Sequence, residues 1–155
     1  NQEILFIFIG SGEKWQFVND FSRENDLSNV KIYPFQTEKK LPYTMALASV
    51  SLVALDVGAE ELMVPSKVFY YLAAGSAVIG ISKNENELKD IIEKNQCGVN
   101  VEPTNPQDLA KVILDILSNK EKLNFFQQNA RKISVGQYSK KSGIAKFKLL
   151  LKNSL

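Results

Sequence analysis

The segment Pro65-Ser66-Lys67 combines three residue types that could bind a phosphate at the start of a helix. Pro65 presets φ just ahead of the helix, and the Ser66 hydroxyl can cap one of its free N–H groups. A helix N-terminus attracts anions because its first N–H groups are unpaired and its dipole is positive there. Lys67 opposes that dipole, which a bound anion would explain, although the side chain can also be simply solvated. We therefore predict a phosphate or diphosphate site at residues 65–67.

The residues that follow this motif indicate how it is held in place. Val68, Phe69 and Leu72 fall on one face at helical spacing, and Gly75 supplies the left-handed residue that commonly ends a helix. Residues 77–81 form an apolar run that is short enough to be a strand buried on both faces. The sequence thus predicts a helix at 66–74 that leads into a buried strand of a parallel sheet.

Strand-like and helix-like segments alternate along the whole chain. The predicted strands are 4–9, 30–33, 51–55, 77–81 and 97–101, and the predicted helices are 13–26, 41–48, 66–74, 85–94, 106–117, a further one to about 133, and 139–152. This alternation predicts an α/β fold with a doubly wound, Rossmann-like parallel sheet of about five strands and helices on both faces. In such folds ligands bind beyond the carboxyl ends of the strands, which here are the loops at 10–14, 34–37, 56–66, 82–85 and 102–105.

The composition is typical of one globular domain. The chain has 155 residues, 45% of them hydrophobic, and no apolar run approaches about 18 residues, so we expect no membrane-spanning helix. Cys97 is the single cysteine, and the sequence contains no histidine and no Asp-x-Asp, so we expect no disulfide, no metal site and a reducing compartment. We expect Cys97 to be a small buried residue, and Trp15, Phe17 and Phe21 to lie in the core.

Charge is unevenly distributed, although the formal net charge is only +2. Residues 131–155 contain seven lysines and arginines and no acidic residue. On the helix expected at 139–152, Ile144, Phe147 and Leu151 share an apolar face with lysines around it. Such a segment can be a solvated helix face, or its basic residues can bind an anionic membrane surface.

Taken in order, several segments resemble one known protein family. They are Phe8-Ile-Gly-Ser-Gly12, Val30-Lys-Ile-Tyr-Pro-Phe35, Leu47-Ala-Ser-Val-Ser-Leu-Val53, Pro65-Ser-Lys-Val-Phe-Tyr-Tyr-Leu-Ala-Ala-Gly75, Cys97-Gly-Val-Asn-Val-Glu-Pro103 and Asn105-Pro-Gln-Asp-Leu109. The series resembles the C-terminal, donor-binding domain of GT-B glycosyltransferases, of the retaining type that builds bacterial polysaccharides. The likeness covers nearly the whole chain, and its most specific part is Pro-Ser-Lys followed by Tyr-Leu-Ala-Ala-Gly.

The resemblance implies which residues hold the nucleotide. Pro34, Phe35 and Gln36 correspond to the turn whose backbone reads the base. The segment Pro65-Ser66-Lys67 corresponds to the diphosphate cradle at the start of a helix. In the family, the positive end of this helix and a basic side chain such as that of Lys67 would stabilise the charge of the departing diphosphate. We therefore expect no metal and no other cofactor.

Further positions match the family less closely. Glu60 and Glu61 lie in the loop where an acidic residue meets the donor sugar. Tyr70 stands where the family usually carries a glutamate that holds the ribose hydroxyls, and a tyrosine hydroxyl is a weaker substitute for it. Tyr70 can therefore face the ribose or pack in the core. Gly10 and Gly12 would let the backbone approach the diphosphate, although they can equally form the tight turn after a strand.

The resemblance also implies parts that this sequence does not contain. The family domain begins one βα unit earlier, with a strand beside the one expected at 4–9, and is preceded by an acceptor-binding domain. The sequence starts at Asn1 rather than Met, so we expect a fragment, 1–155, that does not catalyse transfer alone. The expected partners are a nucleotide diphosphate sugar, a saccharide or lipid-linked acceptor, and the missing N-terminal domain, against which the basic last helix would pack. We expect no nucleic acid partner, and a cytoplasmic location, at the inner membrane face if the basic helix binds lipid.

We expect the complete enzyme to be a glycosyltransferase of the hexosyltransferase type. A nucleotide-sugar epimerase of GT-B fold would bind the same donor, but it needs additional ionisable residues near the sugar. A non-catalytic Rossmann-like or flavodoxin-like module is a further alternative, as is a transferase reduced to a scaffold by the change at Tyr70. A dinucleotide oxidoreductase is disfavoured because Gly10-Ser-Gly12 lacks the third glycine of that motif.

Overall fold

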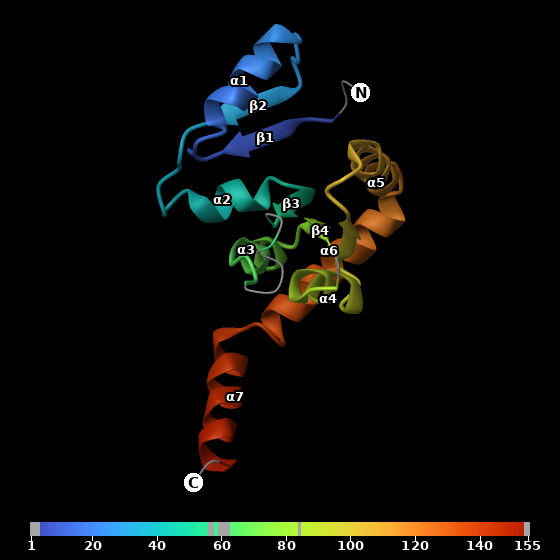
Figure 1. The fold of residues 1–155 in the computed structure, drawn as a ribbon. Helices are drawn as coiled ribbons and strands as arrows, with labels where there is room; N and C mark the ends of the chain where they lie inside the picture. Colours follow the sequence, from blue (N-terminus) through green and yellow to red (C-terminus); the bar gives the residue numbers. More distant parts are fainter. Residues whose placement is uncertain (1–3, 56–57, 59–62, 84, 154–155) are drawn as a thin grey trace. The chain divides into compact units, whose positions relative to one another are not determined.

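The computed structural model describes residues 4–55, 58, 63–83 and 85–153, and the chain divides into two units, Asn1–Tyr43 and Thr44–Leu155 (Figure 1). The strands are β1 Phe6–Ile9, β2 Val30–Tyr33, β3 Val50–Ala54, β4 Ala77–Ile81 and β5 Gly98–Val101. The helices are α1 Trp15–Glu24, α2 Leu41–Ala46, α3 Lys67–Ala74, α4 Glu87–Lys94, α5 Pro106–Ser118, α6 Lys120–Val135 and α7 Lys140–Asn153. Every predicted strand and helix is present, with small shifts at its ends.

The first unit pairs β1 with β2 in parallel, with Phe6 opposite Val30, and α1 connects the two strands. The expectation that Trp15, Phe17 and Phe21 lie in the core is wrong, because α1 has no buried residue. Their exposed fractions are 36%, 69% and 50%. Two strands and one crossover helix offer too little apolar surface to enclose such large side chains.

The second unit contains the parallel sheet β3-β4-β5, with α3 and α4 as its crossover helices. In register, Val50 lies opposite Ala77, and Val78 lies opposite Gly98. The first four residues of β4 are buried, as expected for a central strand covered on both faces. This sheet fixes the positions of α3 and of the loops around it.

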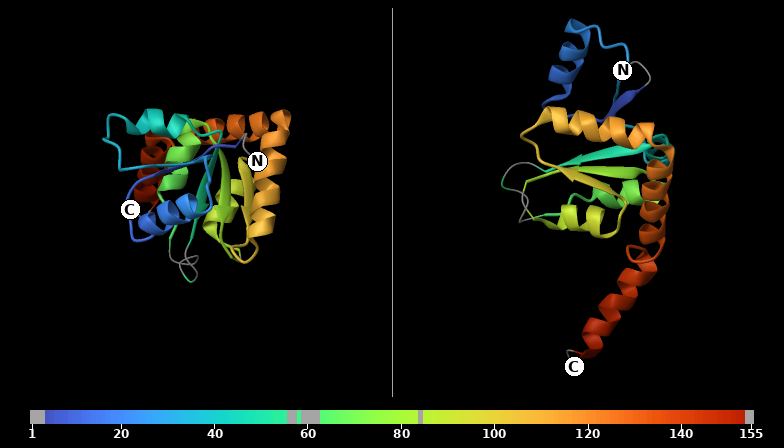
Figure 2. Two further views of the ribbon diagram at one scale, coloured as in Figure 1. Left: turned by 90° about the horizontal axis from the view of Figure 1, so that it is seen from above. Right: turned by 90° about the vertical axis from the view of Figure 1, so that its right-hand side faces the viewer.

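Helices cover both faces of the β3-β4-β5 sheet, as predicted (Figure 2). In its right-hand view, α5 lies on one side of the sheet, and α3 and α4 lie on the other. Eleven buried residues form the main core cluster: Val53, Leu55, Val68, Leu72, Val78, Leu88, Ile91, Ile92, Cys97, Ala130 and Ile133. They come from β3, β4, α3, α4 and α6 and the ends of these elements, so the core directly supports α3. The burial of Cys97 is confirmed.

Asparagine caps begin three of the helices in this unit. The side-chain oxygens of Asn86, Asn105 and Asn119 accept hydrogen bonds from backbone N–H groups in the first turns of α4, α5 and α6. Pro106 occupies the first position of α5, where its missing N–H costs nothing. These local signals explain why the predicted helix starts agree with the structure.

The α/β class with parallel strands is confirmed, but the described strands form two sheets rather than one continuous sheet. Within each sheet the strands pair in chain order. No described strand connects the β1-β2 sheet to the β3-β4-β5 sheet. No helix among the described residues is long and apolar enough to span a membrane.

Candidate functional site

The start of α3 has no side-chain cap, and Phe69 N in its first turn already donates a hydrogen bond to the carbonyl of Ser66. Ser66 is already in the right-handed helical conformation, with φ −56° and ψ −24°, and its side chain makes no capping hydrogen bond. The predicted Ser66 cap is therefore wrong, because a capping side chain needs an extended backbone at the cap position. Pro65 supports the first turn instead, since its carbonyl accepts a hydrogen bond of 3.1 Å from Val68 N. The hydroxyl of Ser66 is thus not used for capping.

The body of α3 is anchored in the core. Val68 and Leu72 are fully buried. The ring of Phe69 packs against that of Tyr138, with 5.0 Å between the ring centroids. Gly75 adopts the left-handed conformation, with φ 73° and ψ 28°, and ends the helix as predicted. The helix therefore presents its N-terminus from a fixed position.

Two of the predicted site residues on α3 are exposed on its surface. Lys67, the first helical residue, is exposed, and Tyr70 lies one turn later with an exposed fraction of 54%. The alternative that Tyr70 packs in the core is wrong. Residues three apart are neighbours on a helix, so Lys67 and Tyr70 share one side of α3.

Topology places the α3 N-terminus at the carboxyl edge of the β3-β4-β5 sheet. The strands are parallel and α3 connects β3 to β4, so the helix begins on the side where β3 ends. The first turn of α3 contains no acidic residue. The positive end of the dipole, the ammonium of Lys67 and the hydroxyl of Ser66 are therefore arranged to attract an anion.

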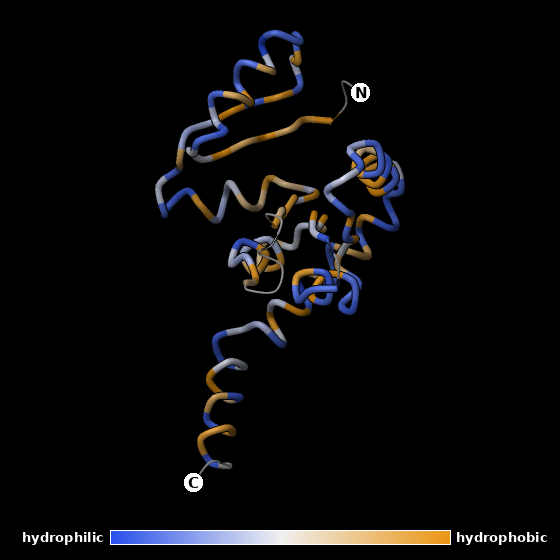
Figure 3. The backbone as a smooth tube through the Cα atoms, in the orientation of Figure 1, coloured by the Kyte–Doolittle hydropathy of each residue, from blue (hydrophilic) through white to orange (hydrophobic). Residues whose placement is uncertain are grey.

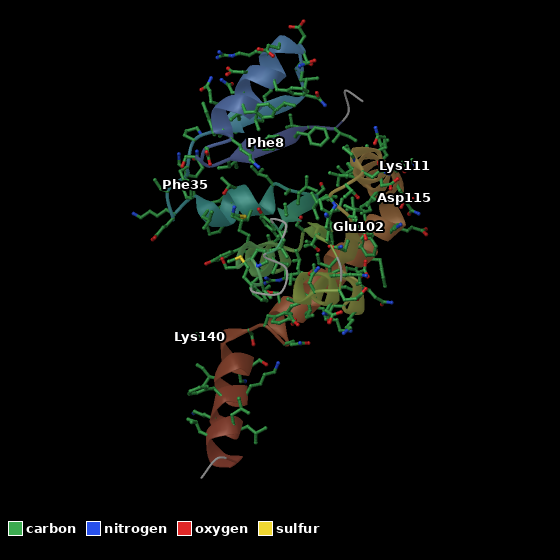
Figure 4. The ribbon with its side chains drawn as sticks, viewed as in Figure 1. Phe8, Phe35, Glu102, Lys111, Asp115 and Lys140 are labelled. Carbon is green, nitrogen blue, oxygen red and sulfur yellow. The ribbon has the colours of Figure 1, made fainter. Side chains whose placement is uncertain are left out.

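In the first unit, the predicted residues after β1 and β2 lie together. Gly10 N donates a hydrogen bond of 3.0 Å to the carbonyl of Tyr33, and a Cβ at Gly10 would lie 4.0 Å from the Phe35 ring. Pro34 and Gln36 form the adjoining turn, in which the Gln36 amide donates to the Pro34 carbonyl at 2.8 Å. Phe35 is largely exposed (Figure 4).

Gly12 shows the turn geometry that the sequence left open. Gly10 and Gly12 have φ values of 148° and 153°, in a region that favours glycine, and the Gly12 carbonyl accepts a hydrogen bond from Trp15 N. The tight turn is thus observed, and an approach of this backbone to a donor stays a prediction. Glu60 and Glu61 lie outside the described residues.

A polar hollow of about 310 Å³ was not predicted. It is lined by Ser82, Glu85, Lys89, Glu93, Asn100 and Glu102. The buried hydroxyl of Ser82 donates to the Asn100 side-chain oxygen at 2.9 Å, and the Asn100 amide donates back to the Ser82 carbonyl at 3.1 Å. A hydrogen bond from Lys89 to Glu85 raises the pKa of the lysine. Ser82, Glu85 and Glu102 belong to the loops at 82–85 and 102–105 that were predicted to line a ligand site, but nothing in the pattern of β5 marked Asn100.

The described residues contain no group of histidine, cysteine and acidic side chains that could hold a metal ion. The candidate site at α3 consists of the uncapped start of the helix with Ser66, Lys67 and Tyr70, which suit a phosphate-bearing ligand. Residues 1–133 match the family described as Glycosyl transferases group 1. The chain belongs to this family. The resemblance read from the sequence is thereby confirmed.

Two curated relatives are similar to this chain over part of their length. The probable glycosyltransferase WbjE of Pseudomonas aeruginosa is 28% identical over 116 residues, which are 75% of this chain and 29% of WbjE. The putative colanic acid biosynthesis glycosyl transferase WcaI of Escherichia coli (strain K12) is 25% identical over 93 residues, 60% of this chain and 23% of WcaI. The chain thus spans less than a third of these relatives.

Solved structures share the fold. HepE of Anabaena, in complex with UDP, matches with a TM-score of 0.76 and 17% identity over 97% of this chain and 41% of HepE. WaaG, a glycosyltransferase involved in lipopolysaccharide biosynthesis, matches with a TM-score of 0.67 and 19% identity over 86% of this chain and 34% of WaaG. These likenesses confirm the predicted GT-B, Rossmann-like fold.

Proposed function

We propose that this group 1 glycosyltransferase chain is the donor-binding part of an enzyme that transfers a sugar from a nucleotide diphosphate sugar. The observation that carries this proposal is the N-terminus of α3, which has no side-chain cap and presents the exposed Lys67 at the carboxyl edge of a parallel sheet. Complexes of HepE with UDP and with UDP-glucose support a ligand of this class. The donor diphosphate is bound by Pro65, Ser66 and Lys67.

The proposed chemistry places negative charge next to α3. In the transfer, the bond between the sugar's anomeric carbon and the diphosphate oxygen breaks, and the oxygen of an acceptor hydroxyl forms the new bond to that carbon. The proton of this hydroxyl passes to the departing diphosphate. The leaving diphosphate gains charge as this bond breaks. The α3 dipole and the Lys67 ammonium stabilise that charge, which lowers the barrier because the donors are already oriented. No residue of the chain is assigned as a general acid or base.

The remaining donor contacts follow from the family resemblance. We propose that Pro34, Phe35 and Gln36 contact the nucleotide base and that Tyr70 contacts the ribose. Exposure of Phe35 and Tyr70 supports these roles, since both side chains are available to a ligand. We propose that Glu60 and Glu61 contact the donor sugar. The backbone at Gly10 and Gly12 contacts the diphosphate.

We further propose that the acceptor binds to a part of the full-length protein other than residues 1–155. The chain matches only 29% of WbjE and 23% of WcaI, so those relatives contain much more than this donor-binding domain. The name of WcaI refers to colanic acid biosynthesis and that of WaaG to lipopolysaccharide biosynthesis, which supports a saccharide or lipid-linked saccharide as the acceptor. Such an enzyme would work in the cytoplasm, at the membrane face where the acceptor lies.

The diphosphate site is tested by titrating UDP and GDP into the full-length protein and its Lys67→Ala variant. Loss of one charge-assisted contact is expected to weaken binding by about 1–3 kcal/mol, or roughly 5- to 150-fold. Lys120→Ala is the matched control, because Lys120 is also an exposed lysine at the first position of a helix. Equal affinities of the two variants would remove Lys67 from the site.

The reaction class is tested separately by following donor consumption by the full-length protein. A transferase releases nucleoside diphosphate and forms a glycosidic product only when an acceptor is present. An epimerase converts the donor sugar without any acceptor, and a binding module consumes no donor. The second or third outcome, with intact donor binding, would contradict the transferase assignment and leave the diphosphate site standing.

A further inference from the structure

The first turn of α3, which carries the proposed diphosphate site, is held by two of its side chains. Val68 is fully buried, and Phe69 packs partly buried against the main core cluster. Lys67 and Tyr70 are exposed. A buried contact at Val68 alone would let this turn rotate about the helix axis. Because successive helical residues lie about 100° apart around that axis, a rotation would swing Lys67 out of position. The contact that Phe69 makes therefore orients the site.

The partner of Phe69 comes from the turn between α6 and α7. The rings of Phe69 and Tyr138 have 5.0 Å between their centroids and are inclined at 58°, a geometry in which aromatic pairs attract each other. This turn is largely hydrophilic (Figure 3), and Tyr138 is the residue of it that packs against the core cluster. The Tyr138 ring therefore forms a wall on which the first turn of α3 rests.

The backbone around Tyr138 is fixed on both sides. The Tyr138 N–H donates a hydrogen bond of 3.1 Å to the carbonyl of Ile133 in the last turn of α6, and the Ile133 side chain belongs to the buried core cluster. On the other side, the Ser139 hydroxyl accepts a hydrogen bond of 3.1 Å from Ser142 N and so caps the start of α7. A turn tied at both ends can hold the Tyr138 ring in one place.

We propose that Tyr138 is a positioning residue for donor binding, which acts through Phe69 on the first turn of α3. The proposal rests on the proposed function, because it concerns the same diphosphate site. Tyr138 does not touch the ligand. Its ring keeps the first turn of α3 in the rotation that presents Ser66 and Lys67 to the diphosphate. Binding groups are effective only when neighbouring packing holds them in place, and a displacement of about 1 Å is costly.

The test is calorimetric titration of UDP into the full-length protein and two variants of Tyr138. Tyr138→Ala removes the ring and should weaken UDP binding about tenfold, because the first turn of α3 loses its support. Tyr138→Phe keeps the ring and should bind UDP as the wild type does, since the ring makes the contact with Phe69. Unchanged affinity in Tyr138→Ala, or equal losses in the two variants, would overturn the proposal.

Phe126→Ala is the control for a purely structural role. Phe126 is an aromatic residue of α6 with an exposed fraction of 9%, and it lies outside the core cluster that supports α3. Truncating this buried ring should lower the melting temperature at least as much as Tyr138→Ala does, without changing the affinity for UDP. If the loss of affinity simply follows the loss of stability across the two variants, Tyr138 has only a structural role and the proposal fails.

A double-mutant cycle with Lys67→Ala examines whether Tyr138 acts by placing Lys67. Truncation of Tyr138 should then weaken UDP binding about tenfold when Lys67 is present, and about threefold or less when alanine replaces it. Equal losses in the two backgrounds would show that the ring acts elsewhere and would overturn the proposal. The single variants separate this inference from the proposed function. If Lys67→Ala weakens binding and Tyr138→Ala does not, only the role of Tyr138 is rejected. If Lys67→Ala binds UDP as the wild type does, the diphosphate site is rejected together with it.

Discussion

The guanidinium of Arg131 on α6 donates a hydrogen bond of 2.6 Å to the backbone carbonyl of Ala73 at the end of α3. Carbonyls in the last turn of a helix lack intrahelical partners, and a cation there also favours the negative end of the dipole. Gly75, just beyond, turns the chain toward β4. Arg131 thus secures the end of α3 opposite the proposed diphosphate site.

Arg131→Ala should lower the free energy of unfolding by about 1–2 kcal/mol. This is less than a buried charged group would contribute, because water screens the exposed arginine. Urea unfolding of the full-length protein measures the change. Lys132→Ala is the control, since it removes the same charge from the adjacent, exposed position and should change stability by under about 0.5 kcal/mol. Equal losses in the two variants would show that the hydrogen bond to Ala73 contributes nothing.

Gly98 permits the close approach of β5 to β4. A Cβ at this position would overlap the backbone carbonyl of Val78 on the neighbouring strand. Gly98→Ala should therefore destabilise the fold by roughly 3 kcal/mol or more, because backbone atoms of a central strand must move. The change appears as a lower midpoint in urea unfolding.

The control for this substitution is Gly143→Ala in α7, where an added Cβ would meet no atom within 4 Å. Alanine at a helix interior is preferred over glycine by about 0.5–1 kcal/mol, so this variant should be neutral or slightly more stable. A Gly98→Ala protein as stable as Gly143→Ala would mean that the strands separate at this point without cost.

The elements around the site could be predicted because their signals are local. Gly75 alone ends α3, and the run Ala77–Ile81 is apolar and short enough to be a buried strand. Val68 and Leu72 repeat with the helical period, which predicts the buried face of α3, and both are fully buried in the structure. These features depend on few residues, all close in sequence.

Features that depend on partners distant in sequence could not be predicted. Phe17 and Phe21 repeat as a core face would, yet they are exposed, because burial requires a covering element and not only an apolar pattern. The backbone conformation of Ser66 removed its expected capping role. The hydrogen bonds between Asn100 and Ser82 join residues that only strand pairing brings together.

Cys97 is fully buried, and burial raises the pKa of its thiol to about 11. Between the ordinary thiol pKa of about 9 and this value, the unfolded chain loses the proton while the folded chain keeps it. The buried, protonated thiol therefore contributes about 2–3 kcal/mol to the free energy of unfolding relative to high pH. This contribution is fully present below about pH 9 and is lost as the pH rises toward 11.

The pH effect is measured as the difference between the wild type and Cys97→Ala in urea unfolding across that range, since lysines and tyrosines titrate equally in both. The wild type should lose stability faster as the pH rises. A thiol-specific reagent at pH 8 should react with Cys97 only after denaturant is added. Rapid reaction with the native protein would show that the thiol is accessible.

Tyr70 is exposed on the same side of α3 as Lys67, so it can be replaced without disturbing the core. Tyr70→Glu introduces the residue that the family usually carries there, and a carboxylate accepts two hydrogen bonds from a ribose diol where a tyrosine hydroxyl accepts fewer. We expect donor affinity to be preserved or increased. The melting temperature should shift by under about 2 °C, as for other exposed substitutions.

Tyr70→Phe is the matched variant, because it keeps the ring and removes only the hydroxyl. If Tyr70 binds the ribose, this variant should weaken nucleotide diphosphate binding by about 0.5–1.5 kcal/mol, the net value of one hydrogen bond. Calorimetric titration of the full-length proteins compares the three side chains at one position. Identical affinities for tyrosine, phenylalanine and glutamate would exclude Tyr70 from the site while leaving the α3 N-terminus as the diphosphate site. A large drop in melting temperature for Tyr70→Glu would instead mean that the side chain is covered in the full-length protein, because burying a carboxylate without a partner is costly.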